Sequence, residues 1–169
     1  LGLILGAGAM VFTGFFDYRK LKKIRYIALI VPMILLALVF VPGVGKSNYG
    51  ATRWIGFGSF TIQPSEIAKY GFVIFAAAYM SEHMDAMRTF KGMLPVLAAG
   101  GAICVLIILE PNMSVTMCVG LLMLAMIFLG GMKFRYFLII LVPALVAVPV
   151  LILMEPYRLL RLSAFLDPW

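Results

Sequence analysis

The chain has 169 residues, of which 64% are hydrophobic and only 12% are charged, and its mean hydropathy is +1.09. A soluble domain of this length needs far more polar surface, so the composition excludes that class and indicates an integral membrane protein. The net charge of +7 does not indicate nucleic-acid binding, because the basic residues form short clusters between apolar runs instead of one basic face.

Apolar runs follow one another along the chain and are separated by short polar segments. About twenty apolar residues cross the hydrocarbon core as a helix, which satisfies its own backbone hydrogen bonds there. The third run reaches this length only if it begins near Pro64. Cys104 and Cys118 lie inside apolar runs and are predicted to be packing residues, not a disulfide or a metal pair. The prediction is an all-α polytopic transmembrane helical bundle, one domain over residues 1–169, with spans at about 1–16, 26–42, 64–81, 93–109, 113–131 and 136–154.

The basic residues are divided unevenly between the two sides that alternating spans create. Nine of the fourteen lie on one side and four on the other, while Lys69 falls inside an apolar run. Under the positive-inside rule the first side is cytoplasmic, and the external side holds the polar loop 43–63, Glu110 and the C-terminal segment 155–169. The basic stretch 17–25 is therefore predicted to be a cytoplasmic loop, in preference to a nucleic-acid or lipid-headgroup site. The nine residues are Arg19, Lys20, Lys22, Lys23, Arg25, Arg88, Lys91, Lys133 and Arg135.

The most polar stretch, Gly45–Glu66, reads GKSNYGATRWIGFGSFTIQPSE. It contains several glycines and no apolar periodicity, so it cannot cross hydrocarbon without leaving peptide groups unpaired. We expect it to lie at the external membrane face, with Arg53 and Trp54 at its centre. Glu66 and Lys69 are three residues apart at a predicted helix start, which makes them neighbours on one face. They are either a capping acid with a snorkelling lysine, or part of a polar cavity that offers the embedded charge a partner or water.

Glu110 ends a seventeen-residue apolar run and precedes a proline, which places a carboxylate at a helix break near membrane depth. It is either an interfacial acid or a member of a functional polar cavity, in which Lys69 or Arg53 would be its cationic partner. Arg158 and Arg161 are three residues apart and would project together from a helix. Two such cations suit a phosphate or diphosphate group, the alternative being contact with lipid headgroups.

Three separated motifs resemble those of the SEDS proteins (shape, elongation, division and sporulation), which include FtsW, RodA and SpoVE. The run VPGVGKSNYGATRWIGFGSFTIQPSEIAKY is similar to the family's signature loop. ILEPNMSVTM is similar to its Q/E-P-D-x-G-T element, and EPYRLLRLSAFLDPW to its PYR…DPW segment. VPGVG and the PYR…DPW form resemble the FtsW/SpoVE branch more than the RodA branch. The resemblance covers essentially the whole chain and implies a fragment, which holds five or six of about ten spans.

The resemblance implies an enzyme, a peptidoglycan glycosyltransferase that polymerises lipid II at the outer face of the bacterial inner membrane in division or cell-shape control. It implies no nucleotide cofactor, and as partners a class B penicillin-binding protein and other division or elongation membrane proteins. A divalent cation accompanying the substrate diphosphate is compatible with it. The reaction needs a base for a sugar 4-hydroxyl and positive charge for the leaving diphosphate. Two alternatives stay open, a lipid II flippase or transporter and a non-catalytic division scaffold.

The expected substrate-binding residues share the external side. The catalytic residue is unknown and is expected just after Trp169, because the family's aspartate follows the DPW element. Asp167 is not assigned this role, since relatives can carry Asn at that position. Asn112 stands where the family has an acid, which removes a charge. No metal site is predicted. The expected substrate-binding set is Arg53, Trp54, Glu66, Lys69, Glu110, Arg158 and Arg161.

Overall fold

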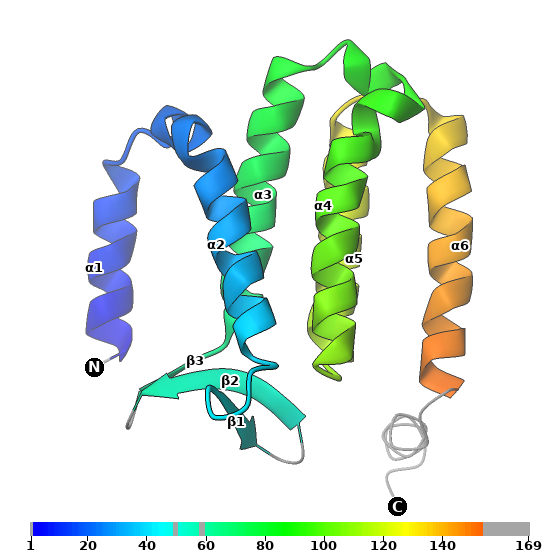
Figure 1. The fold of residues 1–169 in the computed structure, drawn as a ribbon. Coiled ribbons are helices and arrows are strands. Elements are labelled where there is room, and N and C mark those ends of the chain that lie inside the picture. The colour runs from blue at the N-terminus through cyan, green and yellow to red at the C-terminus, as the bar shows by residue number, and fades with distance from the viewer. Residues whose placement is uncertain (1, 49–50, 58–59, 154–169) are drawn as a thin grey trace, which may run out of the picture.

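The computed structural model describes residues 2–48, 51–57 and 60–153, in which six α-helices stand side by side and a small sheet closes one end (Figure 1). Short 3-10 helices connect two pairs of helices at the opposite end. Each predicted span overlaps one of the α-helices. The helices are α1 (Gly2–Gly14), α2 (Arg25–Leu38), α3 (Pro64–Glu82), α4 (Phe90–Leu109), α5 (Met113–Leu129) and α6 (Phe134–Leu153), with 3-10 helices η1 (Tyr18–Ile24) and η2 (Ala86–Arg88).

Among the described residues, α4 alone is long and apolar enough to cross a membrane by itself, with 20 residues. Helix α5 and the part of α6 from Phe134 to Ala147 are apolar but shorter. Helix α3 has 19 residues but carries Glu66 in its first turn, Lys69 one turn further and Glu82 at its last position. The charged residues of α3 therefore mark where that helix leaves the apolar layer.

The polar loop 43–63 contains a three-stranded antiparallel sheet that the sequence analysis did not predict. Its strands are β1 (Gly45–Asn48), β2 (Ala51–Phe57) and β3 (Phe60–Ile62), in the order β1-β2-β3. Lys46 pairs with Trp54, and Ile55 pairs with Ile62. The hydrogen bonds between the strands satisfy backbone N–H and C=O groups, which would otherwise need water as their partner at the membrane surface. Gly45 begins β1 where a Cβ atom would lie only 2.3 Å from the Val39 carbonyl oxygen, so the sheet starts directly against the end of α2.

The tightest helix pair is α2 with α3, and the buried core continues from it onto α4 and α5. Phe72 of α3, Leu36 of α2 and Ile103 of α4 are fully buried. Gly71 allows the close approach, because a Cβ atom there would lie 2.0 Å from the Ala28 carbonyl oxygen. Helix α1, in contrast, has no extensive packing against another described element and leaves residues such as Phe12 70% exposed. Its apolar surface is suited to lipid.

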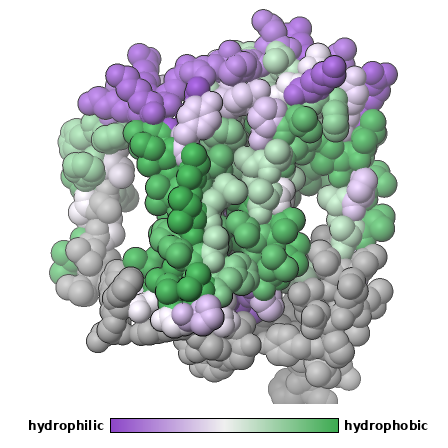
Figure 2. Space-filling view, in the orientation of Figure 1, coloured by the Kyte–Doolittle hydropathy of each residue, from purple (hydrophilic) through white to green (hydrophobic). Residues whose placement is uncertain are grey.

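The two ends of the bundle differ in chemistry. We call the end that carries η1, η2 and the start of α6 the basic end, and the opposite end the sheet end. Figure 2 shows hydrophilic residues forming a band across the basic end, above the apolar flanks of the helices. There Glu82, the last residue of α3, forms one ion pair with Lys22, at 3.3 Å, and a second ion pair with Arg25. Glu82 thus holds η1 and the start of α2 against the end of α3.

We predict that Gly71→Ala lowers the melting temperature of the purified protein, because the added methyl group must push α2 away from α3. Overpacking of this kind costs about 1–3 kcal/mol of unfolding free energy. Gly101→Ala on α4 is the matched control, since a Cβ atom there has no atom within 4 Å. Thermal unfolding in detergent measures both variants. Equal melting temperatures for the two would contradict the close α2–α3 contact.

Candidate functional site

Five of the predicted substrate-binding residues lie at or near the sheet end. Arg53 and Trp54 lie on β2, Glu66 lies in the first turn of α3, and Glu110 follows the last residue of α4. Lys69 lies one turn further along α3. Strand β2, the start of α3 and the α4–α5 turn therefore bring residues from three separate parts of the sequence to one end of the bundle (Figure 1).

Arg53 fastens the sheet to the α4–α5 turn. Its Nε atom donates a hydrogen bond of 3.1 Å to the Glu110 carbonyl oxygen, and its Nη2 atom donates to the Pro111 carbonyl oxygen. The last carbonyls of a helix have no partner within the helix, and a guanidinium group can serve two of them at once. A cation at this position also opposes the negative end of the α4 dipole. Arg53 is therefore committed to backbone contacts and holds the site together.

The Glu110 side chain is buried without a hydrogen-bond partner. It is 1% exposed, and neither carboxylate oxygen has a partner among the described residues. Glu110 lies between α4 and α5, outside both helices, and burial raises the pKa of its carboxyl group to about 7 while the nearby Arg53 charge acts to lower it. A carboxyl group of this pKa can hold or release a proton near neutral pH.

Two further buried polar groups at this end were not in the predicted binding set. Ser65, the second residue of α3, is fully buried, and its Oγ atom has no partner in the described part of the chain. Asn112, just before α5, is 6% exposed, and its Nδ2 atom has no partner among the described residues either. Each unpaired buried group costs about 1–3 kcal/mol, so a polar ligand or water that completes its hydrogen bonds is favoured here. The motifs around both residues were recognised, but a motif does not report burial.

Glu66 and Lys69 form the ion pair that their spacing suggested. The Lys69 Nζ atom lies 2.8 Å from a Glu66 carboxylate oxygen, and the two side chains are 19% and 46% exposed. Lys69 therefore pairs with Glu66 and not with Glu110. The Arg53 side chain donates to the backbone of Glu110 rather than to its carboxylate, so of the two expected cationic partners Arg53 acts on this acid through its charge, without a hydrogen bond to the carboxylate.

The other predicted residues are Trp54 and those of the C-terminal segment. Trp54 is half-buried on β2, beside Arg53. Arg158, Arg161 and Asp167 lie outside the described residues, as does the rest of the segment 155–169.

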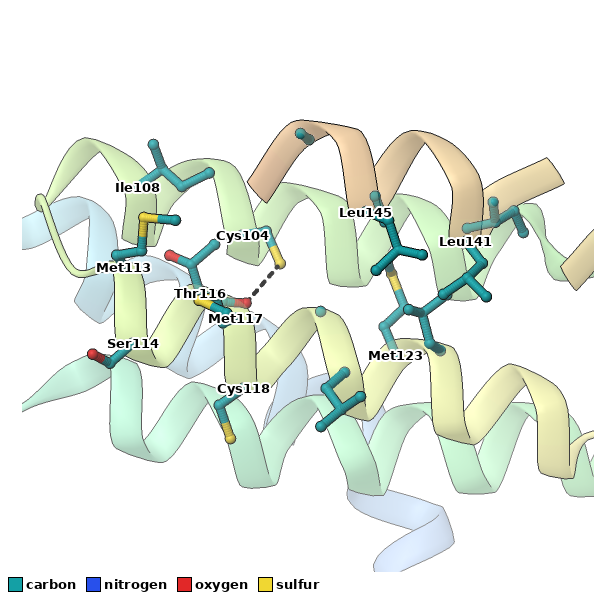
Figure 3. A pocket seen from close by; sticks show the side chains of 16 residues that line it. Cys104, Ile108, Met113, Ser114, Thr116, Met117, Cys118, Met123, Leu141 and Leu145 are labelled. Carbon is teal, nitrogen blue, oxygen red and sulfur yellow. Dashed lines mark hydrogen bonds between the residues drawn. The ribbon is translucent and has the colours of Figure 1, made fainter. Parts of the chain in front are cut away.

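Two hollows open near the site. A cleft of about 410 Å³ lies between the end of α2, the sheet and the α4–α5 turn, and it is lined by residues 39–43, Gly45, Thr52, Leu109 and Pro111. A larger groove of about 660 Å³ runs between α4, α5 and α6 (Figure 3). Its walls are apolar side chains such as Met117, Leu141 and Leu145, and it extends along α5 from Met113, next to the Glu110 turn. In it the Cys104 Sγ atom donates to the Thr116 carbonyl oxygen at 3.8 Å, and both cysteines are free thiols.

The family model of FtsW, RodA and SpoVE, described as "Cell cycle protein", matches residues 1–169. The chain belongs to the FtsW/RodA/SpoVE family. The resemblance that three motifs suggested is thereby confirmed. A probable peptidoglycan glycosyltransferase FtsW of Alcanivorax borkumensis is 36% identical over 170 residues, which cover 100% of this chain and 44% of that protein. The protein of the same description from Pseudomonas fluorescens is 37% identical over 172 residues, covering 99% of this chain and 41% of that protein.

Solved structures of the FtsW/RodA/SpoVE family have the same fold. The Thermus thermophilus rod shape determining protein RodA superposes with a TM-score of 0.70 at 28% identity, over 89% of this chain and 48% of that one. A structure titled "Structural coordination of polymerization and crosslinking by a peptidoglycan synthase complex" gives a TM-score of 0.73 at 28% identity, over 99% of this chain and 50% of that one. The predicted polytopic helical membrane fold is confirmed, and the chain spans about half the length of these relatives or less.

We predict that protonation of Glu110 makes the fold more stable at lower pH. The folded-state pKa of about 7 lies above the ordinary value of 4.5, so the folded state retains a proton that the unfolded state releases between these values. The unfolding free energy should therefore fall as pH rises from 4.5 to 7, by at most about 3 kcal/mol.

Melting temperatures at pH 5 and at pH 7.5 measure this dependence. Glu110→Gln, which cannot ionise, should abolish the decline, whereas Glu66→Gln should retain it because Glu110 is still present. The proposed protonation of Glu110 is refuted if Glu110→Gln shows the same decline as the wild type.

Proposed function

We propose that the protein to which this chain belongs is a peptidoglycan glycosyltransferase that polymerises lipid II at the outer face of the bacterial inner membrane. The observation that carries the proposal is the match of residues 1–169 to one family, with relatives named as probable peptidoglycan glycosyltransferases. The polar and partly buried sheet end supports it as the substrate-handling face. A class B penicillin-binding protein and other membrane proteins of division or elongation are the proposed partners.

Lys69 is the residue of the described site best suited to the diphosphate of lipid II. Its ammonium group is partly exposed and already positioned by Glu66. Because Glu66 is half-exposed, water can solvate its carboxylate when Lys69 turns to a phosphate oxygen. Arg53 has a different task, because its donors are used on the backbone of the α4–α5 turn. Arg158 and Arg161 stay in the proposed binding set.

The chemistry requires a base that accepts the proton of the attacking sugar 4-hydroxyl and cations that stabilise the departing diphosphate. Lys69 supplies one of these cations. Glu110 has a carboxyl group that can exchange a proton near neutral pH, and with Ser65 and Asn112 it offers unpaired polar atoms to the substrate. We assign Glu110 to substrate handling. The proposed catalytic base is a residue that follows the DPW element in relatives.

A divalent cation belongs to this proposal as a companion of the diphosphate. The carboxylates of the described site are Glu66, which is paired with Lys69, and Glu110, which is buried. No three His, Cys, Asp or Glu side chains in the described part of the chain gather in a way that could hold a metal ion. These residues do not fit a protein-bound metal centre, and no step is assigned to one.

The distribution of charge favours polymerisation over transport of lipid II. In the described helices the charged residues lie at the ends of α2, α3, α4 and α6, except Lys69, which lies one turn further into α3 at the sheet end, and α1 and α5 carry none. A transport path for a diphosphate would need polar partners between the two ends. A scaffold without catalytic activity would instead tolerate neutral side chains at the sheet end.

We predict that Lys69→Met in the full-length protein lowers glycan polymerisation from lipid II by about 10- to 100-fold, because a cation that stabilises the leaving group is lost. The assay uses purified protein with its class B penicillin-binding protein partner and measures glycan strand formation. Lys91→Met, at the basic end, should retain full activity. Normal activity of Lys69→Met would remove Lys69 from the site, and wild-type protein that moves lipid II between leaflets without polymerising it would establish transport instead.

The groove between α4, α5 and α6 is proposed to hold part of the undecaprenyl tail of lipid II. We predict that Gly120→Leu raises the KM for lipid II several-fold, because the new side chain occupies the groove while its Cβ atom meets no atom within 4 Å. Gly101→Leu places the same side chain in open space on α4, away from the groove. Polymerisation kinetics compare the two variants. An unchanged KM for Gly120→Leu would place the tail elsewhere.

A further inference from the structure

The 3-10 helix η1 presents three different rows of side chains at the basic end. A 3-10 helix has three residues per turn, so residues three apart lie above one another. Asp17 caps its first turn by accepting a 3.0 Å hydrogen bond from the Arg19 backbone N–H. The η1 residues then divide into a lysine row (Lys20, Lys23), an apolar row (Tyr18, Leu21, Ile24) and an arginine-containing row (Arg19, Lys22), which Arg25, the first residue of α2, continues.

The third row fixes the rotation of η1 about its own axis. Lys22 and Arg25 of this row both pair with Glu82 at the end of α3. Arg25 also lies over the Tyr26 ring, with its guanidinium carbon 4.8 Å from the ring centroid. Two cations on one carboxylate hold this row toward α3, so the other two rows must face away from it.

Among the described residues the lysine row has no polar partner, and the apolar row is exposed at Tyr18 and Ile24 while Leu21 between them is half-buried. Lys20 and Lys23 are exposed, and neither ammonium group takes part in an ion pair or hydrogen bond among the described contacts. In the apolar row Tyr18 is 72% exposed and Ile24 is 44% exposed. Phe15, just before η1, is 90% exposed. The segment thus shows unpaired positive charge and exposed aromatic and aliphatic surface side by side.

The position of η1 between two apolar helices indicates which kind of molecule contacts the lysine and apolar rows. The segment joins α1 to α2, two apolar helices, so both of its ends are held at the surface of the membrane (Figure 1). At that depth, apolar side chains reach acyl chains while lysines extend to headgroups. An acidic protein surface could match the lysines but would leave Tyr18, Ile24 and Phe15 without an apolar partner.

We propose that η1 is a binding site for anionic phospholipids, in which Lys20 and Lys23 contact the headgroup phosphates and the apolar row enters the adjacent acyl layer. This adds lipid binding to the cytoplasmic loop expected for residues 17–25, where the sequence pattern alone favours a plain loop over a lipid-headgroup site. The role is independent of the chemistry at the sheet end. Glu82 serves the site by taking up the charges of Lys22 and Arg25 and leaving the two lysines for lipid.

The test measures which lipids the full-length protein retains. The protein is extracted from vesicles that contain equal amounts of phosphatidylglycerol and phosphatidylcholine, and native mass spectrometry counts each bound lipid. We expect the wild type to retain phosphatidylglycerol preferentially. The double variant Lys20→Gln/Lys23→Gln should lower this preference by about fivefold or more, because each lysine near an anionic surface contributes about that factor.

The control is Arg88→Gln/Lys91→Gln, which removes two other exposed charges from the same end. It should keep the lipid preference, and matching melting temperatures show that both double variants fold. An unchanged preference in the η1 variant overturns the proposal, as does an equal loss in the control, which would assign the effect to overall charge. Loss of a co-purifying acidic protein with an unchanged lipid ratio would assign the lysine row to a protein partner and overturn it as well.

Discussion

The arrangement of the sheet end depends on the two hydrogen bonds that Arg53 donates to the carbonyl groups after α4. They join positions 57 and 58 residues apart in sequence, and they connect the sheet to the α4–α5 turn. A guanidinium group is suited to this task because it remains charged and presents its donors in a fixed plane. The same charge lies near the Glu110 carboxyl group and partly offsets the effect of burial on its pKa. One side chain therefore contributes to both the geometry and the electrostatics of the site.

The buried polar groups at this end are kept at a cost to stability. Ser65, Glu110 and Asn112 each have a buried polar atom without a partner among the described residues. Apolar side chains of similar size would pack there without that cost. Buried polar atoms without hydrogen-bond partners are concentrated at functional sites, where a ligand supplies the missing partners. The polymerase proposal and the unpaired atoms thus point to the same end of the bundle.

Much of the helical fold could be predicted from the sequence, because long apolar runs leave few alternatives in a membrane. The Glu66–Lys69 neighbourhood could also be predicted, since a spacing of three residues brings side chains together on any helix. The sheet could not, because its strands have only three to seven residues and show no clear alternation. Lys69 and Arg53 were both expected as possible cationic partners of Glu110, and the Arg53 charge does act on its carboxyl group. Arg53 nevertheless donates to the backbone of that residue, and sequence does not reveal which oxygen a long side chain will find.

The long sequence separation between Arg53 and its two acceptors affects the order in which the protein is assembled during synthesis. Helices α2 and α3 are adjacent in sequence and pack closely, so this hairpin and the strands between them emerge together during synthesis. The carbonyl groups that receive the Arg53 hydrogen bonds emerge later, after α4 has been translated. Until those carbonyl groups are present, the Arg53 side chain lacks the acceptors that attach the sheet to the α4–α5 turn. Attachment of the sheet then reports that α4 has been inserted and that the next turn is in place, so the site is completed only when the bundle around it is.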